Sequence, residues 1–419
     1  MSVSAPRPPD PLTPEHLVDP WPNYEILRDH HPIVWHEPTQ SWLISRYEHI
    51  RPLLRDQTRW STEHMQDQLG LALGDAPTMT AMDGKQHSAR RSLVSPFLFT
   101  GGLDLFTPTI ERRAKALLEP VFAREREAVA AGTRERGRLD FVTEFSSVYP
   151  VDIMADMMGL PGRDYGLLRE WYNAFITFVG NIAGDPVLIE RGLKAKQGFG
   201  EYILPLIAER RSGDGDDFIS RLCRAEVEGD RMDDEDIRSF LALMLLAGGE
   251  TTDHQLAALL HALVQHPDQL QALADDRSLM DDAMAEGMRY CAIVQFIQRT
   301  AREDVDIDGT VVPAGGKITL MLAAGNRDPR RFEDPDRFDI HRTDHATSRA
   351  FTGNADHLGF GGGRHVCLGM QLSKREVETA LNHLLDNAAD LRLADGYRAE
   401  HEGFFVRSLT SLDLTYTPR

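Results

Sequence analysis

Apolar residues recur at three- and four-residue spacing through most of residues 84–290. This period matches the 3.6 residues of an α-helical turn and places the apolar side chains on one face. Polar, glycine-containing stretches at 132–138 and 212–217 interrupt the pattern, as connections between helices do. The pattern predicts helices near residues 103–130, 140–160, 163–180, 187–211, 216–227, 234–266 and 280–291.

The period shortens near residues 302–322, where short apolar runs are separated by Asp308-Gly309 and Gly315-Gly316. Turn dipeptides between such runs predict β-hairpins. Further strands are expected at 41–47 and 403–416. We therefore predict a mainly α fold with small β regions. The proline-rich residues 1–20 are expected to form an extended segment, and residues 21–419 a single domain.

The 419 residues carry a formal net charge of -19, which disfavours nucleic acid and anionic membranes as partners. No apolar run approaches the roughly 20 residues that a membrane span needs, and the polar N-terminus lacks the pattern of a signal peptide. Three cysteines, an odd number without framework spacing, suit a reducing compartment. We expect a cytoplasmic protein that binds neither nucleic acid nor a membrane.

Residues 360–369, with the sequence FGGGRHVCLG, place Cys367 at the end of a glycine-dense loop. An apolar helical pattern starts directly behind it, so the thiol lies where a helix dipole favours the thiolate. One unaccompanied thiolate suits haem iron, and glycines let a backbone approach a flat macrocycle closely. A lone cysteine is more often an inert, partly buried hydrophobe. The combination with the motifs below favours the metal ligand.

The longest helical pattern, at residues 233–265, carries the sequence LAGGETT at 246–252. Two glycines inside a helix cost about 1 kcal/mol each relative to alanine, so a packing or functional reason is expected. The Thr251 hydroxyl can bond back to the Ala247 carbonyl four residues earlier. A bend there would open a small pocket lined by a hydroxyl and by the Glu250 carboxylate. The alternative is a solvent-facing Glu-Thr-Thr on an amphipathic helix.

These motifs resemble those of the cytochrome P450 family of haem-thiolate monooxygenases. The loop matches most of F-G-x-G-x-H-x-C-x-G and the helix matches A-G-x-[DE]-T, and the resemblance covers roughly residues 20–415. It implies the P450 fold, with haem b (iron protoporphyrin IX) between a long distal helix and the helix behind the cysteine loop. Cys367 would be the axial ligand of the iron, and Phe360 and Gly361 would belong to the haem-binding set.

The resemblance also implies roles for other residues. Glu250 and Thr251 would be the catalytic acid–alcohol pair, in which Thr251 holds dioxygen and a water while Glu250 relays protons. The two haem carboxylates need cationic partners, and the matching positions here are His87, Arg91, Arg299 and His365.

A structural triad is implied by an ExxR pair and a downstream P-x-R-F segment. Glu286 and Arg289 supply the pair, at a spacing that puts both on one helix face. Residues 335–338 match the second segment, so Arg337 is expected to join them and to position the cysteine loop.

The substrate pocket of the family corresponds here to the loop at about 65–82, the helices near 168–195, the distal helix around 243–247, residues 293–298 and the tip at 404–406. Gln295 would give it a polar handle, which favours a functionalised natural product over a plain alkane. Each of these residues could equally be part of the hydrophobic core. The residues expected to line the pocket are Leu243, Ala247, Val294, Gln295, Phe296, Phe404 and Phe405.

No flavin or nicotinamide fingerprint occurs, so the resemblance implies electrons from a separate ferredoxin and its reductase. Candidates for a basic docking patch are Arg90, Arg364, Lys374 and Arg375. The expected reaction uses O2 to oxidise, most simply to hydroxylate, a small organic substrate. Oxidative cyclisation or C–C, C–N or C–O coupling in secondary metabolism stays open. The acid–alcohol pair argues against the two remaining alternatives, a peroxide-driven enzyme and a haem sensor.

Overall fold

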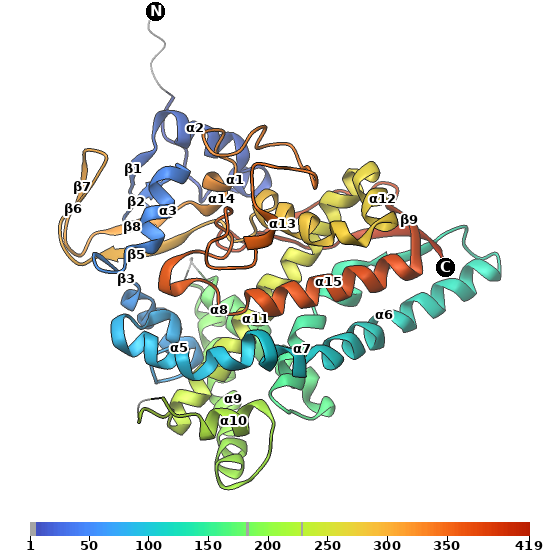
Figure 1. The fold of residues 1–419 in the computed structure, drawn as a ribbon, viewed down its shortest axis with the longest axis horizontal. Helices are drawn as coiled ribbons and strands as arrows, with labels where there is room; N and C mark the ends of the chain where they lie inside the picture. Colours follow the sequence, from blue (N-terminus) through green and yellow to red (C-terminus); the bar gives the residue numbers. More distant parts are fainter. Residues whose placement is uncertain (1–5, 182–183, 228) are drawn as a thin grey trace, which may run out of the picture.

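Helices occupy most of the chain between residues 84 and 290 in the computed structural model, which describes residues 6–181, 184–227 and 229–419. The long α11 (Asp234–Gln265) runs through the middle of this body and packs against α7, α8 and α9 (Figure 1). A capping box between Asp233 and Asp236 begins it. The other helices of the body are α5 (Gly84–Leu98), α6 (Thr107–Ala130), α7 (Tyr149–Met157), α8 (Tyr165–Val179), α9 (Pro186–Ser212), α10 (Phe218–Arg224), α12 (Pro267–Asp275) and α13 (Met280–Tyr290).

Two later helices complete the framework, the short α14 (Leu322–Asn326) and α15 (Met370–Asn387). α15 lies beside α6 and also packs on α11 and α13, which brings the helix behind Cys367 against the centre of the body (Figure 1). The buried apolar face of α15 (Leu372, Val377, Leu381, Leu384) explains this packing. The predicted helices are therefore confirmed in type and approximate extent. A π-helical turn, η4 (Val142–Ser146), precedes α7 where the sequence predicts continuous helix.

The β region contains a five-stranded sheet in the order β1-β2-β8-β5-β3, in which only β2 and β8 are parallel. Its strands are β1 (Ile33–His36), β2 (Ser41–Ile44), β3 (Trp60–Ser61), β5 (Ile297–Ala301) and β8 (Lys317–Leu320). The predicted hairpin is formed by β6 (Val305–Ile307) and β7 (Thr310–Val312), and its turn residues Asp308 and Gly309 both have positive φ. The expected strand at 41–47 is shorter, because Tyr47 begins α3 (Tyr47–Arg55).

Two smaller sheets use the C-terminal part of the chain. One pairs β12 (Asp413–Pro418) with β4 (Gly137–Asp140) and β9 (Ala388–Leu393), and the other pairs β10 (His401–Glu402) with β11 (Ser408–Leu409). The strands at the chain end confirm the β region expected at 403–416. β4 and β9 were not predicted from the sequence.

The N-terminal segment is not extended throughout, which corrects the expectation for residues 1–20. Pro14–Val18 form α1, because the Thr13 side chain caps the helix and Pro14 suits its first turn. Residues 1–5 lie outside the described part of the chain. Two further helices follow, α2 (Trp21–His30) and α4 (Gln66–Leu73). The Arg407 guanidinium donates hydrogen bonds to the carbonyls of Leu17 and Val18, so the C-terminal region holds the end of α1.

Candidate active site

The cysteine loop is shaped by glycines and leads directly into α15. Gly361 and Gly363 both have a φ of 67°, a conformation that favours glycine. A Cβ on Gly363 would lie 2.7 Å from the Leu54 carbonyl oxygen, so only glycine fits between the loop and α3. The Cys367 N–H donates to the Phe360 carbonyl at 2.9 Å, which closes the loop. The loop thus fixes the sulfur just before the first turn of α15.

Opposing electrostatic effects act on the Cys367 thiol. Burial in the protein raises its pKa, while the backbone N–H groups of Gly369 and Met370 and the Arg91 guanidinium favour the thiolate. Cys367 nevertheless has an exposed side chain, whereas Cys223 is buried and carries no such donors. A metal bound to a thiol removes its proton outright, so these N–H donors suit a sulfur that acts as a ligand.

A group of basic side chains gathers around this loop. The rings of His87 and His365 lie 4.2 Å apart between centroids. Arg91 acts electrostatically on both histidines, and Arg299 acts on His365. Arg299 is only 7% exposed, and its guanidinium donates only to the carbonyl of neighbouring Gln298, at 2.7 Å. The structure therefore brings together all four residues expected to bind the haem carboxylates.

One residue of this group was missed in the sequence. Asp83 accepts hydrogen bonds from the Ser61 hydroxyl at 2.6 Å, from His365 Nε2 at 3.2 Å and from Arg302 at 2.7 Å. Its position directly before α5, the helix of His87 and Arg91, is the only sequence signal for it. Asp83 therefore adds a carboxylate to a group that also contains the guanidinium groups of Arg91, Arg299 and Arg302, while burial lowers the pKa of His87 to about 4. The basic excess and the loop sulfur with its N–H donors fit a haem with two carboxylates.

The middle of α11 has the features expected of the distal helix. The Thr251 hydroxyl donates to the Ala247 carbonyl at 3.0 Å, which confirms the predicted back-bond. The side chain of Ala247 is exposed although the six residues before it are buried. The two glycines have a packing reason: a Cβ on Gly248 would lie 2.6 Å from Met154 Sδ of α7. A Cβ on Gly249 would meet Tyr172 of α8 at the same distance.

The carboxyl group of Glu250, beside Thr251, has a pKa near neutral pH. Burial raises the pKa of Glu250 to about 7, and the charge of Asp253 contributes in the same direction. An acid with this pKa exchanges protons readily at neutral pH. The neighbouring Thr252 is buried and interacts instead with Glu376 of α15.

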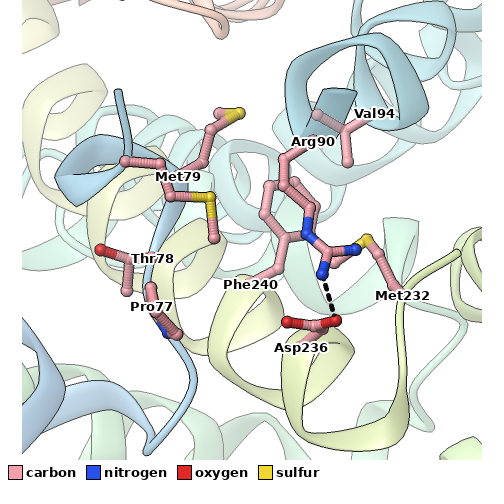
Figure 2. A pocket seen from close by; sticks show the side chains of 9 residues that line it. Pro77, Thr78, Met79, Arg90, Val94, Met232, Asp236 and Phe240 are labelled. Carbon is pink, nitrogen blue, oxygen red and sulfur yellow. Dashed lines mark hydrogen bonds and ion pairs between the residues drawn. The ribbon is translucent and has the colours of Figure 1, made fainter. Parts of the chain in front are cut away.

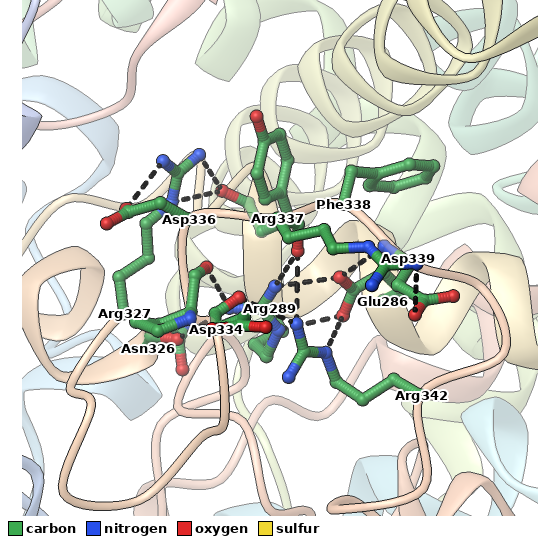
Figure 3. Close-up of polar contacts among 12 residues, drawn as sticks. Glu286, Arg289, Asn326, Arg327, Asp334, Asp336, Arg337, Phe338, Asp339 and Arg342 are labelled. Carbon is green, nitrogen blue, oxygen red and sulfur yellow. Dashed lines mark hydrogen bonds and ion pairs between the residues drawn. The ribbon is translucent and has the colours of Figure 1, made fainter.

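The structural triad forms, but with a different third member. Glu286 and Arg289 are fully buried and paired through two N–O contacts of 2.7 Å (Figure 3). The second cation on Glu286 is Arg342, whose Nε lies 3.4 Å from Oε2. The Arg337 guanidinium is 65% exposed and pairs with Asp339, so the prediction for Arg337 was wrong. The backbone of Arg337, and not its side chain, contacts Arg289: its carbonyl accepts a hydrogen bond from the Arg289 guanidinium. The Arg337 side chain therefore points outward.

The segments expected to line the substrate pocket partly meet. Val294 and Val406 form an isolated β-bridge, and the Gln295 N–H donates to the Phe405 carbonyl at 2.9 Å. The rings of Phe296 and Phe405 lie 5.6 Å apart, edge to face. The Gln295 side chain is buried and makes internal bonds, so it does not provide the polar handle expected for a substrate. Its oxygen accepts from the Tyr24 hydroxyl at 2.7 Å and its nitrogen donates to the Ala292 carbonyl. Phe404 lies on the same tip, while Leu243 and Ala247 lie on α11.

A small cavity between α5 and the start of α11 is lined in part by residues 77–82 of the loop expected at the substrate pocket, and by none of the residues expected to bind haem or to act in catalysis (Figure 2). Arg90 points into it and pairs with Asp236, and its side chain is 15% exposed. Arg90 therefore does not belong to a surface patch, which corrects one member of the expected basic group.

A comparison with family models identifies the class of protein. Residues 28–388 match the model of the cytochrome P450 family, and the chain belongs to this family. Pulcherriminic acid synthase of Bacillus subtilis is 33% identical over 401 residues, which cover 96% of each chain. The cytochrome P450 monooxygenase PikC of Streptomyces venezuelae is 30% identical, with 96% of this chain and 92% of PikC covered.

The fold also matches solved structures. CYP109E1 from Bacillus megaterium in complex with testosterone superposes with a TM-score of 0.81 at 27% identity, over 95% of this chain and 99% of that one. The protein is thus a cytochrome P450 monooxygenase with the mainly helical fold and small sheets of its bacterial relatives, and the family uses haem as its cofactor. Among the described residues, no helix combines the length and apolar character needed to cross a bilayer.

Proposed function

We propose that this P450 uses O2 to hydroxylate a small, functionalised natural product. The observation that carries the proposal is the pair on α11: a half-buried acid with a pKa of about 7 next to a hydroxyl that donates to the Ala247 carbonyl. An enzyme that activates O2 reductively needs such a proton path, whereas a carrier or a peroxide-driven enzyme does not.

The residues of this chain divide the work. When bound, haem supplies the reductive activation of O2. Cys367 would hold its iron, and the basic group around His365 would hold its carboxylates. Thr251 would position dioxygen and a water by its hydroxyl, while Glu250, the neighbouring residue on α11, would deliver protons.

Electrons would come from a ferredoxin and its reductase, in the cytoplasm, where the three unpaired cysteines are stable. The remaining patch consists of Arg364, Lys374 and Arg375, on the cysteine loop and the first turns of α15. Arg364 is exposed and bonds only to the Ser88 hydroxyl, so its charge is free for an acidic partner. Lys374 and Arg375 are partly neutralised by Asp281 and Asp104.

Oxidative cyclisation or coupling is the second candidate. The relative that is 33% identical carries the name of a synthase, pulcherriminic acid synthase, and not of a hydroxylase. Such a reaction would use the same acid–alcohol pair and differ only in the fate of the substrate.

The experiment starts with a spectral binding screen of the purified holoenzyme. Functionalised natural products would be compared with steroids and unfunctionalised fatty acids, using the low- to high-spin shift as the signal. Compounds that bind would then be incubated with ferredoxin, its reductase and NADPH, and the molecular masses of the products measured by mass spectrometry. A gain of one oxygen supports hydroxylation, and a loss of two hydrogens supports coupling. Absence of substrate-dependent NADPH consumption for every hit would contradict the proposal.

A further inference from the structure

A buried carboxyl follows the half-buried Glu250 on the same face of α11. Asp253 lies three residues further along, and its side chain is 6% exposed. The Ser146 hydroxyl, at the end of the π-helical turn η4, donates to Asp253 Oδ1 at 2.5 Å. Asp253 Oδ2 lies 3.5 Å from His254 Nδ1. π-helical turns recur at functional sites, and here one places a hydroxyl on a buried acid.

The surroundings of the two acids contain no cationic partner. Besides Glu250 and His254, the titratable groups that face Asp253 are Tyr172 of α8 and Glu402 of β10. Burial lowers the pKa of His254 to about 4, so the ring is neutral at pH 7. No arginine or lysine of the described chain forms an ion pair with Glu250 or Asp253.

Two neighbouring carboxyls without a cation resist losing both protons. Burial raises the pKa of Asp253 to about 7, and the Ser146 hydroxyl acts in the opposite direction by stabilising the carboxylate. Such a pair titrates as a unit, and its last proton leaves at higher pH than it would from a single acid.

We infer that Asp253 is a positioning residue for proton delivery: with Glu250, three residues before it on α11, it forms a carboxyl pair that stores one proton next to Thr251. In the transfer, the O–H bond of the Asp253 carboxyl breaks and a new O–H bond forms on the Glu250 carboxylate. Solvent water then returns a proton to Asp253. The Ser146 hydroxyl occupies Oδ1, which leaves Oδ2 to carry the proton. The inference rests on the proposed function, because it names the residue that holds the proton before O2 activation.

The test compares Asp253→Asn with the wild-type holoenzyme. Coupled product formation is measured against pH, and the infrared C=O stretch of protonated carboxyls is titrated in the resting enzyme. Glu250, the single remaining acid, should lose its proton at lower pH. The alkaline limb of the pH profile should therefore shift to lower pH by about one unit. The infrared signal titrating near neutrality should lose one component. Asp268→Asn, on the exposed surface of α12, is the matched control and should leave both measurements unchanged.

Ser146→Ala moves the same limb in the opposite direction. It keeps both acids but removes the hydrogen bond that stabilises the Asp253 carboxylate, so the limb should shift to higher pH. A purely structural role would not give shifts of opposite sign, and Ser146→Ala alone decides the question if Asp253→Asn does not fold. Unshifted limbs and an unchanged infrared titration would overturn the inference. The infrared titration needs no turnover, so it tests the carboxyl pair even if the proposed function fails.

Discussion

At the scale of single residues, Cys367 combines accessibility with a set of N–H donors that the other two cysteines lack. The sulfur is held by the loop backbone, not by its own side-chain contacts, so small changes in the side chain leave its position intact. The predictions for this residue and for Thr251 therefore concern chemistry and not folding.

Cys367→Ser should fold with near-native stability, because the two side chains have nearly the same shape. The variant should lose the far-red Soret band that a thiolate-ligated haem gives after reduction and exposure to carbon monoxide. The absorption spectrum of the reduced carbon monoxide complex checks this. A wild-type band in the variant would mean that another side chain ligates the iron.

Thr251→Ala removes the hydroxyl that donates to Ala247. NADPH consumption should continue while the fraction of electrons found in product falls by about tenfold, below the 10²–10⁴ that a fully lost proton relay can cost. The ratio of product to NADPH consumed measures the effect. Thr252→Ala, which alters a buried contact to Glu376, should retain much more of the coupling.

The residue-scale predictions that succeeded depend on local geometry. The Thr251 bond spans four residues of one helix, and the positive φ values of Gly361 and Gly363 belong to one loop. Arg342 and Asp83 were missed because their partners lie far away in sequence. In the region of Arg337 and Arg342 no regular element fixes which arginine turns inward, so the choice depends on the path of the chain around Arg289.

At the scale of elements, the buried Glu286–Arg289 pair connects α13 to an irregular segment on its way to the cysteine loop. Arg289 donates to the carbonyls of Asn326, Pro335 and Arg337, so one side chain connects the end of α14 with the segment at 335–337 (Figure 3). Arg342 forms an ion pair with Glu286 and donates hydrogen bonds to the Glu333 and Asp334 carbonyls. The segment has no helix or strand of its own to hold it, and these arginines replace that support.

Arg342→Gln and Arg337→Gln form a matched pair, because the same change is made five residues apart. Arg342→Gln should lower the free energy of unfolding by about 1.5–3 kcal/mol, the range for hydrogen bonds to charged groups. Arg337→Gln should change it by no more than about 0.5 kcal/mol, as expected for an exposed site. Denaturant unfolding of the holoenzyme measures both. Equal effects would contradict the assignment of Arg342 to the triad.

Element types were predictable wherever the apolar period is sustained, as in α6, α9 and α11. β4 and β9 were missed because each is short and depends on β12, which lies far away in the chain. The sequence around η4 favours helix of some kind, and the extra residue of a π turn leaves no trace in the apolar period.

At the scale of the whole molecule, buried histidines and buried carboxyls affect stability in opposite directions. Burial lowers the pKa of six histidines outside the haem-binding group to about 4 or about 3: His16, His64, His254, His261, His357 and His401. Burial raises the pKa of Glu250 and Asp253 to about 7, and that of Glu376 strongly.

Stability should rise from about pH 4.5 to about pH 6.5. In this window the unfolded chain binds more protons at the histidines than the folded chain does, so raising the pH favours folding. The carboxyls with a raised pKa, which also include Asp152, Asp236 and Asp413, hold protons more tightly when folded and oppose the rise. They are fewer than the histidines with a lowered pKa, which also include His345 and His383. The effect of the carboxyls continues to about pH 7, so stability should stop rising there. Urea midpoints of the holoenzyme across this range measure the curve, and a steady decline from pH 4.5 to 6.5 would contradict the prediction.

The hydrogen bonds from Arg407 to the last turn of α1 have a practical consequence. Arg407 follows Val406 directly, and the backbone on either side of it pairs with residues 293–295, where the Tyr24 hydroxyl also bonds to Gln295. The start of the chain is therefore part of the wall that carries Phe405. Deleting residues 1–20, or attaching a purification tag to them, should change which compounds the enzyme accepts more than it changes folding.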